Sequence, residues 1–153
     1  MHVKENMPKL KESGGFDYYY DVYSDGNEMV AIHVLDPLKK IKVAIAEFEM
    51  RSADTYFITL PYVRPEYRKT GIALEIYKTI LKFGAIASGK AQSYQAVGLW
   101  KKMMKELPNE VVFVDDMGKE HKAILKDDDI VVADSGKSVY GEKMGGFLKI
   151  YQS

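Results

Sequence analysis

The sequence predicts a single α/β (α+β) domain. In it, an N-terminal antiparallel meander is followed by a strand–helix–strand crossover, with two main helices in all and further strands at the C-terminus. Three observations support this prediction. First, short segments that alternate apolar and polar residues fill the first third of the chain. Second, a strand-like run passes through a charged loop into an amphipathic segment between Tyr56 and Phe83. Third, another amphipathic segment ends at Pro108. A length of 153 residues fits one domain.

The composition is that of a folded globular protein without a charge bias. Apolar residues make up 46% of the chain and charged residues 29%, and 22 basic residues balance 22 acidic ones. Net charge therefore gives no argument for nucleic acid or a membrane as a partner, and neither is expected. No run approaches the ~20 apolar residues of a membrane span, so the expected location is cytoplasmic. The absence of cysteine excludes disulfides and thiolate metal sites.

Residues 1–15 are interpreted as a flexible lead-in, and residues 16–153 as the domain itself. The lead-in carries several charges and ends in Ser13-Gly14-Gly15, a composition that favours mobility. We find no internal repeat in the remainder of the chain.

Four strands are expected to form the meander. Alternation with a period of two, as from Phe16 to Tyr23, indicates strands with one buried face. Asp25-Gly26 predicts a hairpin turn, and Asp36-Pro37 breaks the second strand. Because the connections are short, neighbouring strands should be antiparallel. The predicted strands are residues 16–23, 29–35, 41–50 and 54–63.

The segment that follows Gly71 is predicted to be a helix that ends at Gly84. Its apolar stripe consists of Ile72, Ile76, Ile80 and Phe83. Residues 85–88 are too few for a helix and suit a buried strand parallel to the one before the helix. Such a strand–helix–strand crossover is expected to be right-handed.

A second helix is predicted from Ser93, its N-cap, to Leu107, where Pro108 ends it. The remaining predicted strands are residues 111–114, 130–133 and 147–151. The last of these is expected to be an edge strand. Such a strand can pair with a second copy of the chain and form a homodimer. Asp127-Asp128-Asp129 lacks the spaced ligands of a calcium loop and is interpreted as a solvated turn, so no metal site is predicted.

The connection between Val63 and the first helix is a candidate anion site. Several backbone N–H groups at a helix N-terminus lack an intrahelical partner, and Gly71 lets a ligand approach the backbone closely. Arg68 and Lys69 add positive charge. The alternative interpretation is an ordinary strand-to-helix turn with a solvated basic edge.

Arg68-Lys69-Thr70-Gly71-Ile72-Ala73 fits the pattern R/Q-x-x-G-x-G/A. Val63, Pro65 and Glu66 precede it at the spacing seen in the acetyl-CoA-binding motif of GNAT-type N-acetyltransferases. The chain resembles that superfamily in this segment. The resemblance implies a GNAT-like mixed sheet, the crossover described above and acetyl-CoA as the cofactor.

A further segment is similar to the second signature of the same family. Ser93, Ala96, Leu99 and Trp100 stand where the family has asparagine, alanine, leucine and tyrosine. Small GNAT-like proteins encoded by bacteriophages show a similar run with tryptophan after leucine. The resemblance extends from Tyr56 to Leu107, about a third of the chain.

The chain departs from the family before Arg68. GNAT domains usually place two helices between their first and second strands, often as a wall of the acceptor site. No helical pattern long enough to supply both precedes Arg68. The acceptor side of the site is therefore the part that the resemblance informs least.

The resemblance implies direct transfer of an acetyl group from acetyl-CoA to a primary amine, without a covalent enzyme intermediate. Backbone N–H groups from Arg68 to Ala73 would hold the pyrophosphate. Main-chain groups of Leu60 and Val63 would bind the pantetheine, and the N–H near Leu60 would stabilise the oxyanion. The implied cofactor-binding residues are Leu60, Val63, Arg68, Lys69, Thr70, Gly71, Ile72, Ala73, Ser93 and Trp100.

Glu47 and Glu49 are the first candidates for the general base, because they share a face of the strand before the motif. Two nearby carboxylates would raise the pKa of one of them toward neutrality. Alternatively, both glutamates face solvent at a sheet edge. Tyr56 and Thr59 are weaker candidates.

The family often uses a tyrosine as the acid toward the thiolate, and Trp100 stands at that position. An indole N–H donates hydrogen bonds but has no accessible acidity. Ser93, a water molecule or bulk solvent would then protonate the thiolate, or acid catalysis is absent. Ser93 is the candidate acid within the chain.

The acceptor implied by the resemblance is an amine, on either a small molecule or a protein lysine. Two other functions remain open. One is a CoA-binding regulatory or partner-binding protein with little catalysis, which the missing strand carboxylate and Trp100 favour. The other is a β-rich interaction protein without a cofactor.

Overall fold

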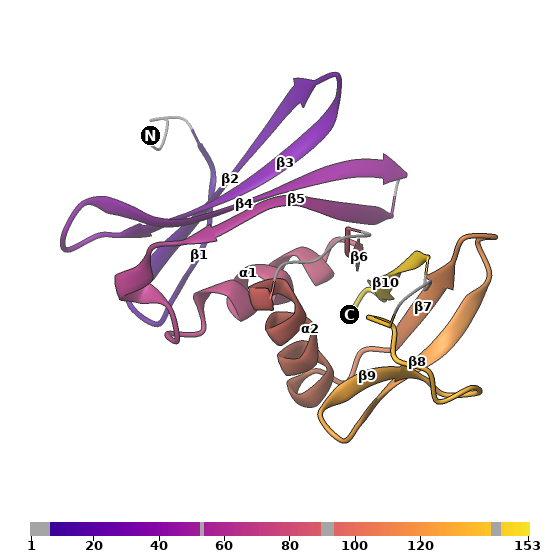
Figure 1. Cartoon of the computed structure of the whole chain (residues 1–153). Coiled ribbons are helices and arrows are strands. Elements are labelled where there is room, and N and C mark those ends of the chain that lie inside the picture. Colours follow the sequence, from indigo (N-terminus) through magenta and orange to yellow (C-terminus); the bar gives the residue numbers. More distant parts are fainter. Residues whose placement is uncertain (1–6, 53, 90–93, 142–144) are drawn as a thin grey trace. The chain divides into compact units, whose positions relative to one another are not determined.

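The computed structural model describes residues 7–52, 54–89, 94–141 and 145–153. The chain divides into two compact units, unit 1 (Met1–Lys78) and unit 2 (Thr79–Ser153) (Figure 1). Unit 1 contains β1 (Lys9–Ser13), β2 (Phe16–Asp25), β3 (Asn27–Asp36), β4 (Ile41–Ser52), β5 (Thr55–Val63), the short 3-10 helix η1 (Pro65–Tyr67) and the start of α1 (Ile72–Leu81). Unit 2 contains the end of α1, β6 (Ala85–Ala87), α2 (Tyr94–Glu106), β7 (Val111–Asp115), β8 (Glu120–Lys126), β9 (Asp129–Val132) and β10 (Gly146–Ile150).

The predicted fold class, an α/β (α+β) domain with a GNAT-like mixed sheet and two main helices, is wrong. Strands make up most of the regular structure in the described part of the chain, whereas α1 and α2 contribute only 10 and 13 residues. β2, β3 and β4 alone extend over 10, 10 and 12 residues. Both units are therefore built mainly of β-sheet.

Two strands that the sequence did not predict explain part of this error. β1 lies within the predicted flexible lead-in, and no residue of it is fully buried. β8 has one buried residue, Ala123, among exposed and half-buried neighbours. Neither segment has an alternating apolar face, so periodicity could not reveal it. Each is stabilised by pairing with a neighbouring strand, a contact that depends on the tertiary structure.

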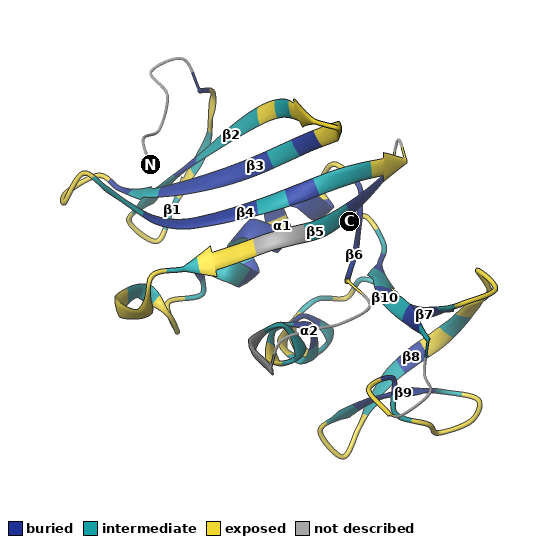
Figure 2. Cartoon of the chain, turned by 45° about the horizontal axis from the view of Figure 1, so that its top comes forward, coloured by how far each residue is buried: buried dark blue, intermediate teal, exposed yellow. Residues whose placement is uncertain are grey.

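Unit 1 is an antiparallel sheet with the strand order β1-β2-β3-β4-β5. Gly26 connects β2 to β3 with a φ of 75°, a left-handed conformation that glycine adopts without a steric cost. Burial is greatest along β3 and β4, in the interior of the strand order (Figure 2). The functional segment after β5 is therefore attached to a well-packed sheet.

Phe48 of β4 is the centre of the core of unit 1. Its side chain is fully buried, and its ring meets Tyr56 of β5 and Tyr77 of α1 edge-to-face, with centroids 6.5 and 5.9 Å away. Ile72 and Ile76 of the predicted apolar stripe are each 2% exposed. The apolar side chains of α1 in unit 1 are thus part of the core beside Phe48.

Unit 2 has the antiparallel strand order β6-β10-β7-β8-β9. The strand predicted over residues 147–151 is present as β10, but it is not an edge strand, because it pairs with β6 on one side and β7 on the other. Ser88 extends this pairing, since its N–H donates to the carbonyl of Leu148 at 2.8 Å and its Oγ accepts from the Leu148 N–H at 2.9 Å. The prediction of an edge strand at residues 147–151, on which the possible homodimer rested, is therefore wrong.

α2 packs against β8 through an apolar face on which Trp100 and Met103 are 1% and 0% exposed. The turn from β8 to β9 consists of Asp127 and Asp128, whose φ values of 50° and 59° are left-handed. A two-residue hairpin turn with this twist suits aspartate, which tolerates positive φ. Neither helix of the described residues is long and apolar enough to cross a membrane.

Candidate functional site

The segment that joins β5 to α1 has a defined backbone path. The N–H of Arg64 donates to the carbonyl of Val43 at 2.8 Å, and η1 follows with Pro65 in its first turn. Lys69 and Gly71 then take φ values of 71° and 83°, both left-handed. Two of the three residues directly before α1 are thus left-handed.

Gly71 is the N-cap of α1. Its carbonyl accepts the first intrahelical hydrogen bond, from the N–H of Glu75 at 3.0 Å. Helix geometry therefore leaves the N–H groups of Ile72, Ala73 and Leu74 without an intrahelical acceptor. The positive end of the helix dipole adds to the attraction that these groups have for an anion.

Two side-chain hydrogen bonds fix the loop before α1. The Nε of Arg68 donates to the carbonyl of Val63 at 3.1 Å, and the hydroxyl of Thr70 donates to the carbonyl of Tyr67. Both side chains are exposed, as is that of Lys69. Of the predicted pyrophosphate residues, Arg68, Lys69 and Thr70 are thus exposed, Gly71 and Ala73 are half-buried, and the side chain of Ile72 is buried.

Tyr67 connects this loop to the turn between β3 and β4. Its hydroxyl donates to Oδ2 of Asp36 at 3.0 Å, while Oδ1 of Asp36 accepts the N–H groups of Leu38 and Lys39 at 3.0 and 3.3 Å. The Tyr67 ring also packs edge-to-face on Phe16, with centroids 5.7 Å apart. One buried carboxylate therefore orders both segments.

Asp36 is 9% exposed. Desolvation by itself would raise the pKa of its carboxyl group. The hydrogen bonds from the Tyr67 hydroxyl and from the N–H groups of Lys39 and Leu38, together with the charge of Lys39, nevertheless hold this pKa below its ordinary value. Asp36 is accordingly ionised at neutral pH.

Acid is expected to weaken this connection. A carboxyl group whose pKa is lower in the folded than in the unfolded chain stabilises the fold above the unfolded value, about 3.9, and loses that effect as the pH falls through the folded value. Asp36→Asn should therefore lower the urea midpoint at pH 7 and make the midpoint fall less between about pH 5 and pH 2. Glu106→Gln, at an exposed position of α2, is the control. An unchanged pH profile in Asp36→Asn would contradict this role.

β5 carries a bulge next to the predicted pantetheine site. Leu60 pairs with Glu47 and Ile58 with Phe48, so Thr59 has no partner residue on β4. A bulge disrupts the ladder locally and leaves main-chain groups unpaired. Thr59 is thus the residue of β5 that the register with β4 leaves out, directly before Leu60.

Glu47 and Glu49 lie on one face of β4, as the sequence predicted, and each has its own partner. The Tyr23 hydroxyl donates to Glu47, and the Nε of Arg51 donates to Glu49 at 2.9 Å. Burial, and then the hydrogen bond to Glu47, raises the pKa of Tyr23 to about 12. Tyr23 therefore stays protonated and acts as a donor.

Lys42 extends the polar surface around Glu47. Its Nζ lies 2.8 Å from Nδ1 of His33, which is 8% exposed. Desolvation lowers the pKa of Lys42, and the negative charge of Glu47 opposes that effect. We call Tyr23, His33, Lys42 and Glu47 the polar cluster. It is assembled from β2, β3 and β4.

Tyr56 is not part of this cluster. It is 9% exposed and its ring meets Phe48, so it belongs to the face of the sheet opposite Glu47. Desolvation, followed by the charge of Glu28, raises its pKa, which makes it a poor base at neutral pH. The structure separates the weaker base candidate from the two carboxylates.

The remaining predicted site residues lie elsewhere. Ser93, the candidate acid, lies outside the described residues. Trp100 belongs to unit 2, and its side chain, which is 1% exposed, is a core residue. Its role toward a cofactor stays a prediction.

Sequence reasoning did not find Tyr23, Asp36 or Tyr67 as site residues. Asp36 appeared only as a strand-breaking residue before proline, and Tyr67, which directly precedes the motif Arg68–Ala73, was not singled out. The pairing of Asp36 with Tyr67 spans 31 residues and leaves no periodic signal. The tyrosine-rich alternation of β2 indicated a strand and gave no reason to single out Tyr23.

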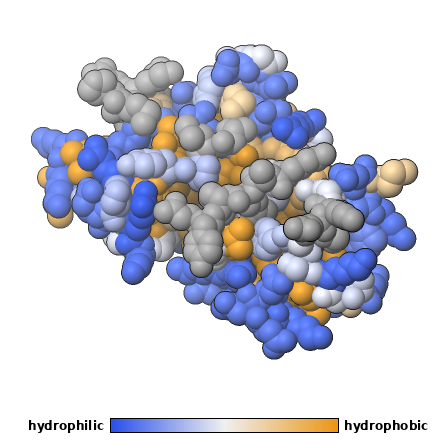
Figure 3. All heavy atoms as spheres, in the orientation of Figure 1, coloured by the Kyte–Doolittle hydropathy of each residue, from blue (hydrophilic) through white to orange (hydrophobic). Residues whose placement is uncertain are grey.

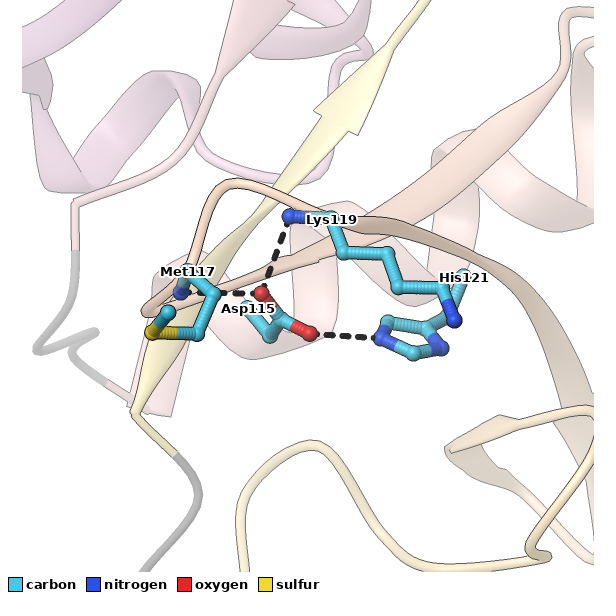
Figure 4. Close-up of polar contacts among 4 residues, drawn as sticks. All are labelled: Asp115, Met117, Lys119 and His121. Carbon is cyan, nitrogen blue, oxygen red and sulfur yellow. Dashed lines mark hydrogen bonds and ion pairs between the residues drawn. The ribbon is translucent and has the colours of Figure 1, made fainter.

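A separate polar arrangement occurs in unit 2, at the turn from β7 to β8 (Figure 4). Asp115 accepts the N–H groups of Met117 and Lys119 at 2.9 Å each on Oδ1, and its Oδ2 lies 2.8 Å from Nε2 of His121. The hydrogen bond with His121, followed by the N–H of Lys119, lowers the pKa of Asp115. Within the described ranges no three His, Asp or Glu residues are grouped to hold a metal ion. This arrangement shapes the turn.

Comparison with known proteins gives no family for the chain. No protein-family model matches it, and no curated protein sequence matches it. Function is therefore argued from the geometry of the described residues, together with the motif that the sequence contains.

Proposed function

We propose that this chain is an acetyltransferase that binds acetyl-CoA at the β5–α1 connection and transfers its acetyl group to a primary amine. One observation carries the proposal: Gly71, with a left-handed φ, is the N-cap of α1, and the first-turn N–H groups that helix geometry leaves unpaired follow the exposed cations Arg68 and Lys69 directly in the chain. This arrangement suits a diphosphate. The proposal concerns the site alone, because one type of site can occur on different folds.

The space beside Gly71 is open in the part of the chain that the structure describes. A Cβ atom added at Gly71 would have no described heavy atom within 4 Å beyond its chain neighbours. Lys69 and Thr70 are exposed on the same loop.

When bound, acetyl-CoA would supply an activated acetyl thioester. The chain has to hold it, stabilise the negative charge on the carbonyl oxygen and accept a proton from the amine. The first two tasks would fall to main-chain groups at the bulge, where Thr59 has no partner residue on β4 directly before Leu60, and to main-chain groups of Val63 at the end of β5. These assignments use backbone atoms and do not require a particular side chain.

We assign the base to Glu47. Glu47 pairs in register with Leu60, which places its main chain beside the β5 segment proposed to bind the thioester. Glu49 is already paired with Arg51. The protonated hydroxyl of Tyr23 would orient the Glu47 carboxylate. The acceptor would be a small-molecule amine or a protein lysine, in the cytoplasm.

A second candidate function is coenzyme A binding with little catalysis, in a regulatory or partner-binding role. The burial of Trp100 favours it, because the position at which the resemblance implies a tyrosine acid is taken by a core side chain. Transfer would then lack an acid from α2. Both functions need the same cofactor loop, so activity distinguishes them and binding does not.

Acetyl-CoA is expected to stabilise the protein in thermal or urea unfolding. A ligand at about 100 times its dissociation constant stabilises the folded state by about 2.7 kcal/mol. Release of free thiol from acetyl-CoA, measured across a panel of amines and lysine peptides, would establish transfer. Stabilisation without thiol release would favour the regulatory function. No stabilisation at any concentration would reject both and favour an interaction protein without a cofactor.

A further inference from the structure

Positive charge is concentrated around the proposed cofactor loop, although the chain as a whole is neutral. Residues 36–42 and 64–69 together contain six basic residues and two acidic ones. Five of the basic side chains are exposed, and we call these five the basic surface. Its members are Lys39, Lys40, Arg64, Arg68 and Lys69.

None of these five cations forms an ion pair among the residues that the structure describes. Elsewhere in the described chain, Lys9, Lys11, Arg51 and Lys105 form ion pairs with Glu12, Glu75, Glu49 and Asp128. Asp36 interacts with Lys39 through its charge alone, because its carboxylate accepts the Tyr67 hydroxyl and two backbone N–H groups.

The two segments that form the basic surface are held side by side. Besides the bond between Tyr67 and Asp36, the Nε of Arg64 donates to the carbonyl of Lys42 at 2.8 Å. The Nζ of Lys39 lies 5.8 Å from the centroid of the Tyr67 ring. In Figure 1 the β3–β4 turn and η1 lie together at the left, and Figure 3 shows mainly hydrophilic surface at that end.

The proposed function leaves part of this charge without a role. A diphosphate on the first turn of α1 would be served by the N–H groups, Arg68 and Lys69. Lys39 and Lys40 come from a different segment, and nothing in the pyrophosphate assignment uses them. Coenzyme A carries another phosphate, a monoester on its ribose, which bears a charge close to −2 at neutral pH.

We propose that Lys39 and Lys40 form a subsite for the ribose 3′-phosphate of coenzyme A, next to the diphosphate loop. This inference rests on the proposed function, which it deepens. The Asx turn of Asp36 fixes the backbone from Leu38 to Lys39, and the bond to Tyr67 sets the turn against the loop. The subsite makes the protein select coenzyme A over 3′-dephospho-coenzyme A.

Isothermal titration calorimetry with these two compounds tests the subsite. Charge-assisted hydrogen bonds are strong enough that wild-type protein is expected to bind coenzyme A about ten-fold more tightly than its dephospho form. The double substitution Lys39→Gln/Lys40→Asn should remove this preference while leaving affinity for dephospho-coenzyme A unchanged. Asparagine is chosen because Lys40 has a φ of 55°, which asparagine tolerates.

The matched control is Lys102→Gln/Lys126→Gln, which removes two exposed lysine charges from unit 2. It should keep the ten-fold preference, and circular dichroism should show that both double variants fold. Equal binding of the two compounds by wild-type protein, or a preference that survives in Lys39→Gln/Lys40→Asn, would overturn the subsite and leave the proposed function intact. Failure of wild-type protein to bind either compound would overturn both.

Discussion

Replacing Gly71 by valine is expected to abolish tight binding of acetyl-CoA while the protein remains folded. Gly71 has a φ of 83°, and a residue with a Cβ atom pays roughly 1–2 kcal/mol to stay left-handed. A β-branched side chain is the least tolerant of this region. Because the space around a new Cβ is empty, the effect would come from the backbone alone, which would move the N–H groups of α1 out of position.

We expect the dissociation constant of Gly71→Val to rise at least about 100-fold, since several charge-assisted hydrogen bonds would be lost together. Calorimetric titration with acetyl-CoA measures this change. Gly118→Val is the matched control, because Gly118 has a φ of 80° in the β7–β8 turn and equally open surroundings. It should suffer the same backbone strain and bind acetyl-CoA normally. Wild-type affinity in Gly71→Val would remove the loop from the proposal.

Phe48→Ala is expected to be the most destabilising single substitution considered. Truncation of a fully buried phenylalanine costs about 3–5 kcal/mol, from lost burial and from the cavity that remains. The edge-to-face contacts with Tyr56 and Tyr77 would be lost as well. Since Tyr77 belongs to α1, the substitution should also loosen the helix that carries the proposed anion site.

Urea denaturation followed by circular dichroism measures this loss, and the fluorescence of Trp100, the single tryptophan, follows unit 2 separately. Phe83→Ala is the control, because Phe83 is 57% exposed and its truncation should change the free energy of unfolding by no more than about 0.5 kcal/mol. A loss below about 1 kcal/mol in Phe48→Ala would show that Phe48 is not the centre of the core of unit 1.

The local elements were predictable where one face of a segment is buried. Alternation indicated β2, the turn signals Asp25-Gly26 and Asp36-Pro37 delimited β3 and β4, and the spacing of Ile72 and Ile76 indicated α1. The same stripe was extended too far, to Phe83, which lies beyond the helix and is exposed. Periodicity reports burial along one element and does not report where a helix stops.

The fold class was not predictable from these signals. β1 and β8 have no buried stripe, and the position of β10 between β6 and β7 depends on contacts between segments far apart in the chain. For the same reason the candidate site was only partly predictable. The loop from Arg68 to Ala73 is continuous in sequence, so a motif could point to it, whereas the polar cluster is assembled from three strands and was represented only by Glu47.

The hydrogen bond between Asp36 and Tyr67 has an evolutionary consequence. It couples the length of the β3–β4 turn to the position of the loop before α1. An insertion in the turn would therefore also displace that loop, 31 residues later. Surface turns usually tolerate length variation, and the β7–β8 turn, whose polar contacts lie between Asp115 and His121, has that freedom. Divergent descendants of this chain should therefore vary at the second turn and keep the length of the first.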